Sequence, residues 1–171
     1  EKPLIEIIAD MESNGIKVKK NKLVALSKNF SKQLSILQDK IFSCSGIEFN
    51  INSTKQLGEI IFDKLKIPGA KKNKSGSFST NSEVLETLAE QGYKIASLVL
   101  SWREISKLKS TYTESLTNYI SSKTNRVHTT FQMTGAQTGR FSSTDPNLQN
   151  IPIKSKNGKE IRKTFVSEEG Y

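Results

Sequence analysis

The sequence predicts an α+β fold that is predominantly helical, with a long antiparallel helical hairpin followed by a small β portion. Two observations predict the hairpin, because apolar residues recur at near-heptad spacing from 23 to 44 and at helical spacing from 95 to 120. A third observation predicts the β portion, because apolar and polar residues alternate from 127 to 133 as in a half-buried strand. The patterning therefore changes from helical to strand-like near residue 123.

The first two helices are predicted from their apolar spacing and their ends. A leading helix carries Leu4, Ile5, Ile8 and Met11. Asn14 and Gly15 end it, and a short extended segment follows at 16–18. Asn21 is a good N-cap for the next helix, which is predicted to run for about 24 residues and to stop at Gly46. Cys44 lies on the apolar stripe of this helix, so we expect it to fill the core.

Capping residues predict two shorter helices. Ser53 with Gln56 three residues later forms a capping box that opens a helix of about 12 residues. Thr80 with Glu83 forms a second capping box, and the helix that it opens ends at Gly92. Together with the two long helices, these complete the predicted helical hairpin domain.

Apolar residues from 95 to 120 define the longest predicted helix, which is about 27 residues long. After a turn at 123–126, the predicted strand carries Val127, Thr129, Phe131 and Met133 on alternate positions. The Asn157–Gly158 pair predicts a turn, and a second strand is predicted from 159 to 166.

Composition favours a polyanionic partner. The 171 residues can form one domain, or one domain and part of another, and their net charge is +9. Such a field attracts nucleic acid, although a run of charges is equally typical of a solvated face. The segment near 68–78 is rich in lysine, glycine and serine, so we expect a mobile, exposed tip there. Arginine is scarce, with four residues against 22 lysines, and its planar guanidinium offers several donors in a geometry that lysine cannot supply.

Several classes of site and location are excluded by residue type. Cys44 is the only cysteine and His128 the only histidine, which excludes a disulfide, a zinc site and a Cys/His nucleophile pair. No apolar run approaches the roughly 20 residues that span a bilayer, and the N-terminus lacks a signal-peptide pattern. We therefore expect a protein of the cytoplasm with no membrane partner.

The stretch from 138 to 152 is the most informative part of the chain. It has no helical or strand periodicity, and it contains two prolines, one arginine and three side-chain amides. Pro146 and Pro152 fix backbone angles and push the residues before them towards extended conformations. Asn147, Gln149 and Asn150 should thus sit on a stiffened loop, which is typical of a recognition surface.

This stretch resembles the motif T-G-R-x-S-S-x-x-P-N-x-Q-N-I-P of family A DNA polymerases, and every fixed position of that motif is present. The resemblance continues through further segments, which are Phe49–Leu57, Leu108–Tyr112, Ile161–Val166 and Glu169–Tyr171. It therefore covers essentially the whole chain.

The resemblance implies three parts of a polymerase domain. Residues 1–19 would contribute to the base of the palm, 20–122 would form the thumb, and 123–171 would begin the palm. The palm would stop before the first catalytic aspartate, so no catalytic or metal-binding residue is expected in this chain. Glu1 in place of a starting methionine fits a piece of a longer protein.

The implied parent enzyme is a DNA-directed DNA polymerase, a nucleotidyltransferase of DNA replication and repair. It would add deoxynucleotides to a primer with two Mg²⁺ ions, and the present chain would be inactive by itself. The implied partners are primer–template DNA and deoxynucleoside triphosphates, and we expect a monomer. The implied location is the bacterial cytoplasm at the nucleoid, with an organellar homologue as the alternative.

The resemblance also assigns roles within the loop. Arg140 would contact the minor groove at the primer terminus, where purine N3 and pyrimidine O2 are acceptors common to all base pairs. The alternative is a loop-bracing pair with Asp145. Gln149 and Asn150 would face the template and the duplex, with two further residues, Asn147 and Lys154, beside them. Hydrogen bonds that brace the loop are the alternative for these amides.

In the helical part, the resemblance implies that Asn50, Asn52 and Ser53 hold the duplex backbone, while Ser53 also caps a helix. The polar shoulder of the longest helix would approach the duplex through Arg103, Lys107, Ser110 and Thr111. For Arg103 the alternative is a pair with a neighbouring glutamate. We expect the Tyr112 ring in the core, with at most its hydroxyl reaching DNA.

The lysines of the tip, Lys71, Lys72 and Lys74, would add salt-dependent attraction or merely solubility. Two other functions compete with the polymerase reading. One is a non-catalytic basic helical module that binds nucleic acid by charge alone, and the other is a helical scaffold whose charges are solvated. Neither explains the proline-bounded motif.

Overall fold

The computed structural model describes residues 2–73 and 76–168. The chain forms two compact units, of which unit 1 comprises Glu1–Asn29 and Leu108–Tyr171 and unit 2 comprises Phe30–Lys107. Two helices, α2 (Lys20–Ser45) and α5 (Lys94–Leu108), each run from one unit into the other. The boundaries predicted at residues 20 and 122 both lie inside unit 1.

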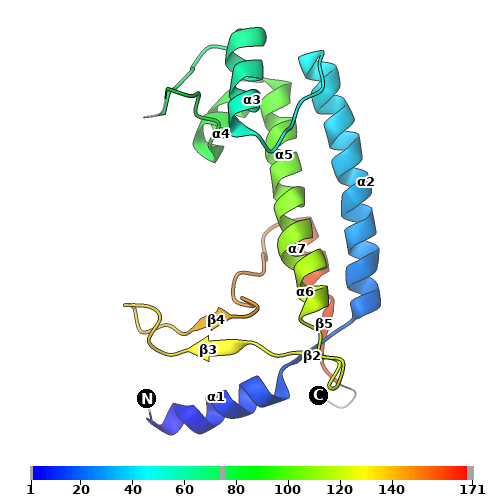
Figure 1. The fold of residues 1–171 in the computed structure, drawn as a ribbon, viewed down its shortest axis with the longest axis vertical. Helices are drawn as coiled ribbons and strands as arrows, with labels where there is room; N and C mark the ends of the chain where they lie inside the picture. Colours follow the sequence, from blue (N-terminus) through cyan, green and yellow to red (C-terminus); the bar gives the residue numbers. More distant parts are fainter. Residues whose placement is uncertain (1, 74–75, 169–171) are drawn as a thin grey trace. The chain divides into compact units, whose positions relative to one another are not determined.

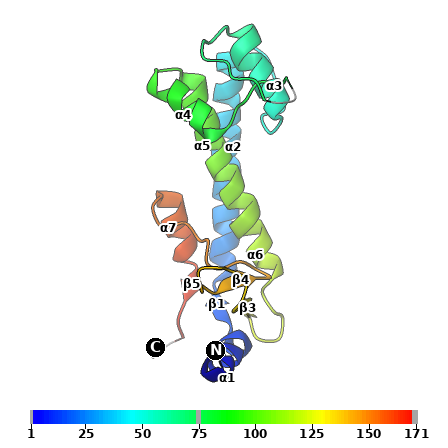
Figure 2. The ribbon, with the colours of Figure 1, turned by 90° about the vertical axis from the view of Figure 1, so that its left-hand side faces the viewer.

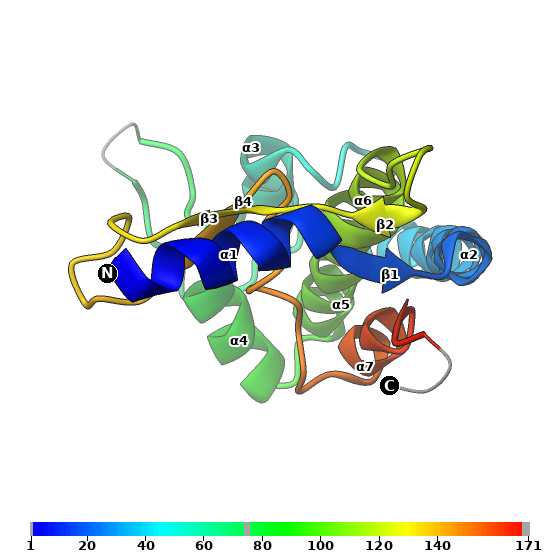
Figure 3. The ribbon, with the colours of Figure 1, turned by 90° about the horizontal axis from the view of Figure 1, so that it is seen from below.

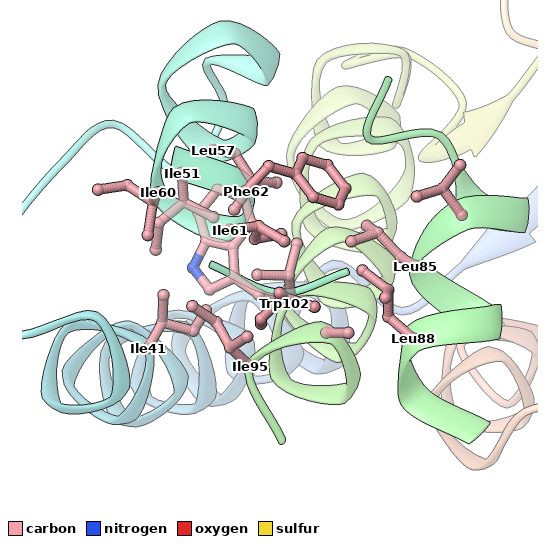
Figure 4. Close-up of a cluster of buried hydrophobic side chains, with 14 residues drawn as sticks. Ile41, Ile51, Leu57, Ile60, Ile61, Phe62, Leu85, Leu88, Ile95 and Trp102 are labelled. Carbon is pink, nitrogen blue, oxygen red and sulfur yellow. The ribbon is translucent and has the colours of Figure 1, made fainter. Parts of the chain in front are cut away.

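Unit 2 is a helical unit built around one apolar core. Its part of α2 and its part of α5 run in opposite directions, as the predicted hairpin requires (Figure 1). The shorter elements are α3 (Thr54–Gly58), the π-helical η1 (Glu59–Lys64) and α4 (Ser82–Glu90). Side chains from all of these elements converge in Figure 4, and Leu57, Ile61 and Leu85 are fully buried there. Cys44 packs against this cluster as predicted.

The capping box at Ser53 is confirmed in part. The Ser53 Oγ accepts a hydrogen bond from the Gln56 N–H at 3.3 Å and caps α3. The Gln56 Oε1, however, accepts from the Asn50 N–H at 2.8 Å instead of from the cap residue. The bond therefore fixes the turn that leads into the helix.

The predicted cap at Thr80 is wrong by one residue. Asn81 is the N-cap of α4, and its Oδ1 accepts from the Val84 N–H at 3.0 Å. Thr80 is buried, and its hydroxyl and carbonyl oxygens accept hydrogen bonds from Arg103. A tertiary contact thus occupies Thr80, and the neighbouring asparagine supplies the cap.

The lysine-rich tip is hydrogen-bonded in its described part. The Ser79 N–H donates to the Lys71 carbonyl at 2.7 Å, and the Asn73 N–H donates to the Ser77 carbonyl at 2.7 Å. Residues 74–75 of the predicted mobile tip lie outside the described residues.

Unit 1 contains two small antiparallel sheets. In the first, β1 (Ile16–Val18) lies between β2 (Arg126–Val127) and β5 (Phe165–Val166). In the second, β3 (Thr130–Gln132) pairs with β4 (Ser142–Thr144), with Phe131 opposite Ser143. Helix α1 (Lys2–Asn14) runs alongside β3, as Figure 3 shows from below.

Gly15 ends α1 as predicted, for a geometric reason. Its φ is +59°, and a Cβ at this position would lie 2.6 Å from the Val127 carbonyl oxygen. Only glycine permits the chain to turn so closely into β1.

The long helix at 94–118 is continuous, but its middle is not α-helical. After α5 it continues as the π-helical η2 (Lys109–Glu114) and ends as α6 (Ser115–Asn118). The apolar spacing predicted the length and could not predict the π-helical segment, because apolar residues four positions apart, as at 108, 112 and 116, are equally typical of an α-helix. None of the helices in the described ranges 2–73 and 76–168 is long and apolar enough to cross a membrane.

The strand predicted at 127–133 is divided in two. Val127 pairs with β1, whereas Phe131 pairs with β4, so the chain changes partner at His128 and Thr129. His128 is held between the Glu12 carbonyl oxygen and the Thr124 hydroxyl, at 2.8 and 2.7 Å from its ring nitrogens.

The strand predicted from 159 to 166 is wrong for most of its length. The chain forms helix α7 (Lys156–Arg162), and only β5 is a strand (Figure 2). Ser155 caps α7 by accepting from the Gly158 N–H at 3.1 Å. A Cβ at position 158 would lie 2.7 Å from the Pro152 carbonyl oxygen, so Gly158 serves close packing and not a turn.

The helix that was predicted to begin after an Asn21 cap already includes Asn21, because α2 begins at Lys20.

We expect Leu57→Ala to lower the free energy of unfolding by about 2–5 kcal/mol, because it leaves a cavity among side chains that are fully buried. Ile36→Ala is the matched control, since Ile36 is 54% exposed on α2 in the same unit. The control should change the free energy by at most about 0.5 kcal/mol. Urea unfolding of both variants measures the difference, and equal losses would contradict the assignment of this core.

Candidate nucleic-acid interface

The proline-bounded loop follows β4 and does not begin as predicted. Residues 142–144 form a strand in a stretch that was expected to have none. Asp145 was expected to be extended, but its φ is +53°, and the bond to Pro146 is cis. Aspartate tolerates this left-handed region better than most residues. The loop therefore does not begin with the extended residue that the sequence predicted.

Two hydroxyl groups lie under this loop. Thr129 is 7% exposed and Ser143 is fully buried, and their Oγ atoms are 2.6 Å apart. The Thr129 Oγ1 lies 2.8 Å from the Pro146 carbonyl oxygen and 2.9 Å from that of Thr144. The Ser143 Oγ accepts from the Leu148 N–H at 3.1 Å. Thr129 was predicted on a strand and Ser143 lies within the motif at 138–152, but the sequence assigned a function to neither residue.

The amide side chains of the loop take different roles. The Asn147 Oδ1 accepts from the Gln149 N–H at 3.0 Å, so Asn147 braces the loop. Gln149 and Asn150 are exposed to solvent. The Asn150 carbonyl oxygen accepts a hydrogen bond from the Tyr112 hydroxyl, which anchors the loop to η2.

Tyr112 is buried as predicted, and its hydroxyl is used within the protein. The residue is 5% exposed. Burial raises the pKa of this hydroxyl above its ordinary value of 10.0. The neutral form that donates to the Asn150 carbonyl therefore persists to higher pH than in an exposed tyrosine.

Arg140 lies in the connection between β3 and β4, directly after Gly139, whose φ is +72°. Its side chain is exposed, and no ion pair joins it to Asp145 in the part of the chain that the structure describes. The predicted alternative of a loop-bracing pair is thus not observed. Lys154, beyond the loop, is also exposed.

On the long helix, the predicted residues divide between the units. Ser110 and Thr111 are exposed on η2 in unit 1, and Lys107 is exposed on α5 in unit 2. Arg103 is half-buried, and its guanidinium donates to the Thr80 carbonyl oxygen at 2.5 Å and to the Thr80 Oγ1 at 3.3 Å. Burial lowers the pKa of Arg103. The predicted alternative of a pair with a glutamate is wrong among the described residues, because a threonine is the partner.

The remaining predicted residues lie in unit 2. The Asn50 Oδ1 accepts from the Asn52 N–H at 3.0 Å, which shapes the turn before the Ser53 cap. Lys71 forms an exposed ion pair with Glu83 at 3.6 Å, and the Lys72 ammonium lies 5.5 Å from the Phe78 ring centroid. Lys74 lies outside the described residues.

A basic surface on α7 was missed by sequence reasoning, because the segment was predicted to be a strand. Lys163 donates to Glu160 at 2.6 Å, and this bond is the main cause of the lowered pKa of Glu160. The charges of Lys156 and of Lys22, at the start of α2, lower it further. Four basic residues occur between 156 and 163 and only one acidic residue, so this surface is positive.

Comparisons with known proteins give one consistent result. The sequence profile of DNA polymerase family A matches residues 20–171. The chain is 46% identical over 171 residues to a DNA polymerase I of Caldicellulosiruptor bescii, which covers all of this chain and 20% of that protein. It is 43% identical to a DNA polymerase I of Rhizobium leguminosarum and 42% identical to a thermostable DNA polymerase I of Thermus aquaticus. The chain spans 17% and 21% of their respective lengths.

A solved structure gives the same result. It is described as the POL domain of Pol1 from M. smegmatis in complex with DNA primer-template and dNTP. The TM-score is 0.90 at 40% sequence identity, and the match covers all of this chain and 30% of that one. The fold of the present chain is therefore similar to part of a polymerase domain.

We expect the free energy of unfolding to contain a contribution from Tyr112 that disappears at high pH. Because the native-state pKa is raised above 10.0, this contribution is fully present below the unfolded-state pKa and is lost as the pH rises through the native one. Tyr112→Phe should remove this part of the pH dependence, which begins near the ordinary pKa of 10.0 and continues above it. Tyr119→Phe, 40% exposed at the end of α6, should keep it. Identical pH profiles for wild type and Tyr112→Phe in denaturant unfolding would contradict this role.

Proposed function

The chain belongs to DNA polymerase family A, and from this premise we propose that it supplies part of the surface with which a DNA-directed DNA polymerase holds primer–template DNA. In this proposal, unit 2 with the long helices is the thumb, and the sheets of unit 1 begin the palm. The proposed location is the bacterial cytoplasm, at the nucleoid. The relative bound to DNA primer-template and dNTP supports the choice of substrate.

The observation that carries the proposal is the exposure of Arg140, Gln149 and Asn150 beside a braced loop. Asn147 and Tyr112 hold the loop backbone through hydrogen bonds, so the backbone that carries Gln149 and Asn150 has little freedom to lose on binding. A polymerase must accept every correct base pair, and the minor-groove acceptors common to all pairs suit arginine and amide donors. We propose that these three side chains contact the minor groove and the template near the primer end.

Phosphate contacts would supply sequence-independent affinity. The proposed set is exposed or at a helix start and comprises Asn50, Asn52, Ser53, Lys71, Lys72 and Lys154. Lys107, Ser110 and Thr111, which are exposed on the long helix, would instead approach the duplex near its minor groove. Lys154 would contact a phosphate through a single ammonium group instead of a bidentate guanidinium. Arg103, on the long helix, and Asn147, beside Gln149, were also predicted to contact DNA, and their hydrogen bonds within the protein favour a supporting role.

The chemistry of nucleotide addition is proposed for the whole enzyme and not for these residues. Two Mg²⁺ ions would activate the primer hydroxyl and stabilise the leaving pyrophosphate of the incoming deoxynucleotide. Among residues 2–73 and 76–168, no group of three or more His, Cys, Asp or Glu side chains could hold a metal ion. The described residues therefore do not fit a metal centre, and we propose for them the binding and orientation of DNA.

We expect Arg140→Ala to lower the preference of this chain for a recessed primer–template junction over blunt duplex by about ten-fold, because a base-edge contact is lost. Fluorescence anisotropy with labelled recessed duplex, blunt duplex and single strand, over a salt series, measures this preference. Arg162→Ala is the matched control, since it removes one exposed positive charge from α7.

The control also separates the competing function. A basic module that binds by charge alone would lose equal affinity in Arg140→Ala and Arg162→Ala and would show no junction preference. Binding that fails even at low salt would support a scaffold with solvated charges and would refute the proposal.

A further inference from the structure

We propose that Thr129 and Ser143 form a positioning pair that fixes the loop backbone from 146 to 150, and with it the side chains proposed to read the primer–template duplex. This inference rests on the proposed function for its consequence in DNA binding. The pair contacts the loop directly and needs no other part of the molecule.

The first step is the geometry of the pair. Thr129 lies between β2 and β3, where the chain changes strand partner, so it belongs to neither strand. Ser143 is the middle residue of β4 and is fully buried. Their oxygens are 2.6 Å apart, and the two residues are joined across 14 positions of sequence.

The second step is the balance of donors and acceptors. The pair has two hydroxyl protons, and its nearest carbonyl acceptors belong to Thr144 and Pro146. The Ser143 Oγ also accepts the Leu148 N–H. A continuous chain from Leu148 through Ser143 and Thr129 to the Pro146 carbonyl uses each of these protons once. Removal of either hydroxyl leaves a buried or half-buried polar group with fewer partners, which is unfavourable.

The third step is the position of these contacts in the loop. Pro146 and Leu148 flank Asn147, whose own side chain fixes Gln149. The Tyr112 hydroxyl then fixes the Asn150 carbonyl. Thus the hydroxyl pair holds the start of the loop, and the tyrosine holds its end, while the side chains of Gln149 and Asn150 remain exposed.

The test uses two substitutions at Thr129 with opposite effects. Thr129→Val keeps the shape and removes the hydroxyl, whereas Thr129→Ser keeps the hydroxyl and removes the methyl group. Ser143→Ala is the second hydroxyl deletion. Its control is Ser142→Ala, because Ser142 is half-buried on the same strand and its Oγ is 3.5 Å from Gln132.

The first measurement is amide hydrogen exchange of the 171-residue chain without DNA. We expect Thr129→Val and Ser143→Ala to speed exchange at Leu148 by about ten-fold or more while exchange at Val127 changes little, because the opening is local. Thr129→Ser and Ser142→Ala should resemble wild type. Unchanged exchange at Leu148 in both hydroxyl deletions would overturn the proposal. So would fast exchange in Thr129→Ser with normal exchange in Thr129→Val, since that result would indicate packing.

The second measurement is affinity for a recessed primer–template duplex. The two hydroxyl deletions should weaken binding by about ten-fold without changing the salt slope, because no phosphate contact is removed. Wild-type affinity in both, despite faster exchange at Leu148, would refute the link to DNA. A wild-type chain that binds no DNA would instead refute the proposed function, and the exchange result would still decide whether the pair holds the loop.

Discussion

An irregular loop carries backbone donors and acceptors that no helix or strand can pair, and in unit 1 this constraint is met by side chains beneath it. Thr129 and Ser143 supply the partners at the start of the loop, and Tyr112 supplies one at its end. Burial makes these bonds costly to break, because an unpaired polar group would have little water to replace its partner. The exposed Gln149 and Asn150 depend on this support for a defined position.

The continuous helix at 94–118 performs a similar task in each unit. In unit 2, Arg103 donates to Thr80 and so fixes the segment that leads into α4. Beyond the boundary at residue 107, Tyr112 holds the loop through Asn150. Both contacts join a side chain of the helix to the backbone of a non-helical segment. The helix therefore packs its apolar stripe into the core and also fixes neighbouring non-helical segments through its polar side chains.

Charge and geometry are supplied by different residues in this chain. Lysine provides most of the net charge of +9, and the α7 surface shows how several lysines influence one carboxylate. Two of the four arginines serve where several donors must be placed together, as Arg103 does at Thr80 and Arg126 does between Glu168 and the Gly15 carbonyl. Arg140 differs from these two, because it is exposed and has no ion pair with a described residue. This difference is consistent with a partner outside the chain.

The sequence by itself determined the features that depend on residues close together in the chain. Apolar spacing predicted the long helices, Ser53 predicted its helix start, and the contiguous motif from 138 to 152 identified the family. Each of these signals is carried by residues close together in the sequence, so it can be recognised without knowing the tertiary structure.

Only the tertiary structure decided the features that depend on distant partners. Helix α7 at 156–162 is an intermediate case, because its Ser155 cap is local, whereas the packing of Gly158 against Pro152, which excludes the turn suggested by Asn157–Gly158, exists only in the folded chain. The chain changes strand partner at Thr129, since Val127 pairs with Ile16 of β1 and Thr130 pairs with Thr144 of β4. The hydroxyl pair and the Tyr112 bond join residues 14 and 38 positions apart. No periodicity encodes such pairs, since a hydroxyl's role is set by the polar groups that folding brings within hydrogen-bond distance.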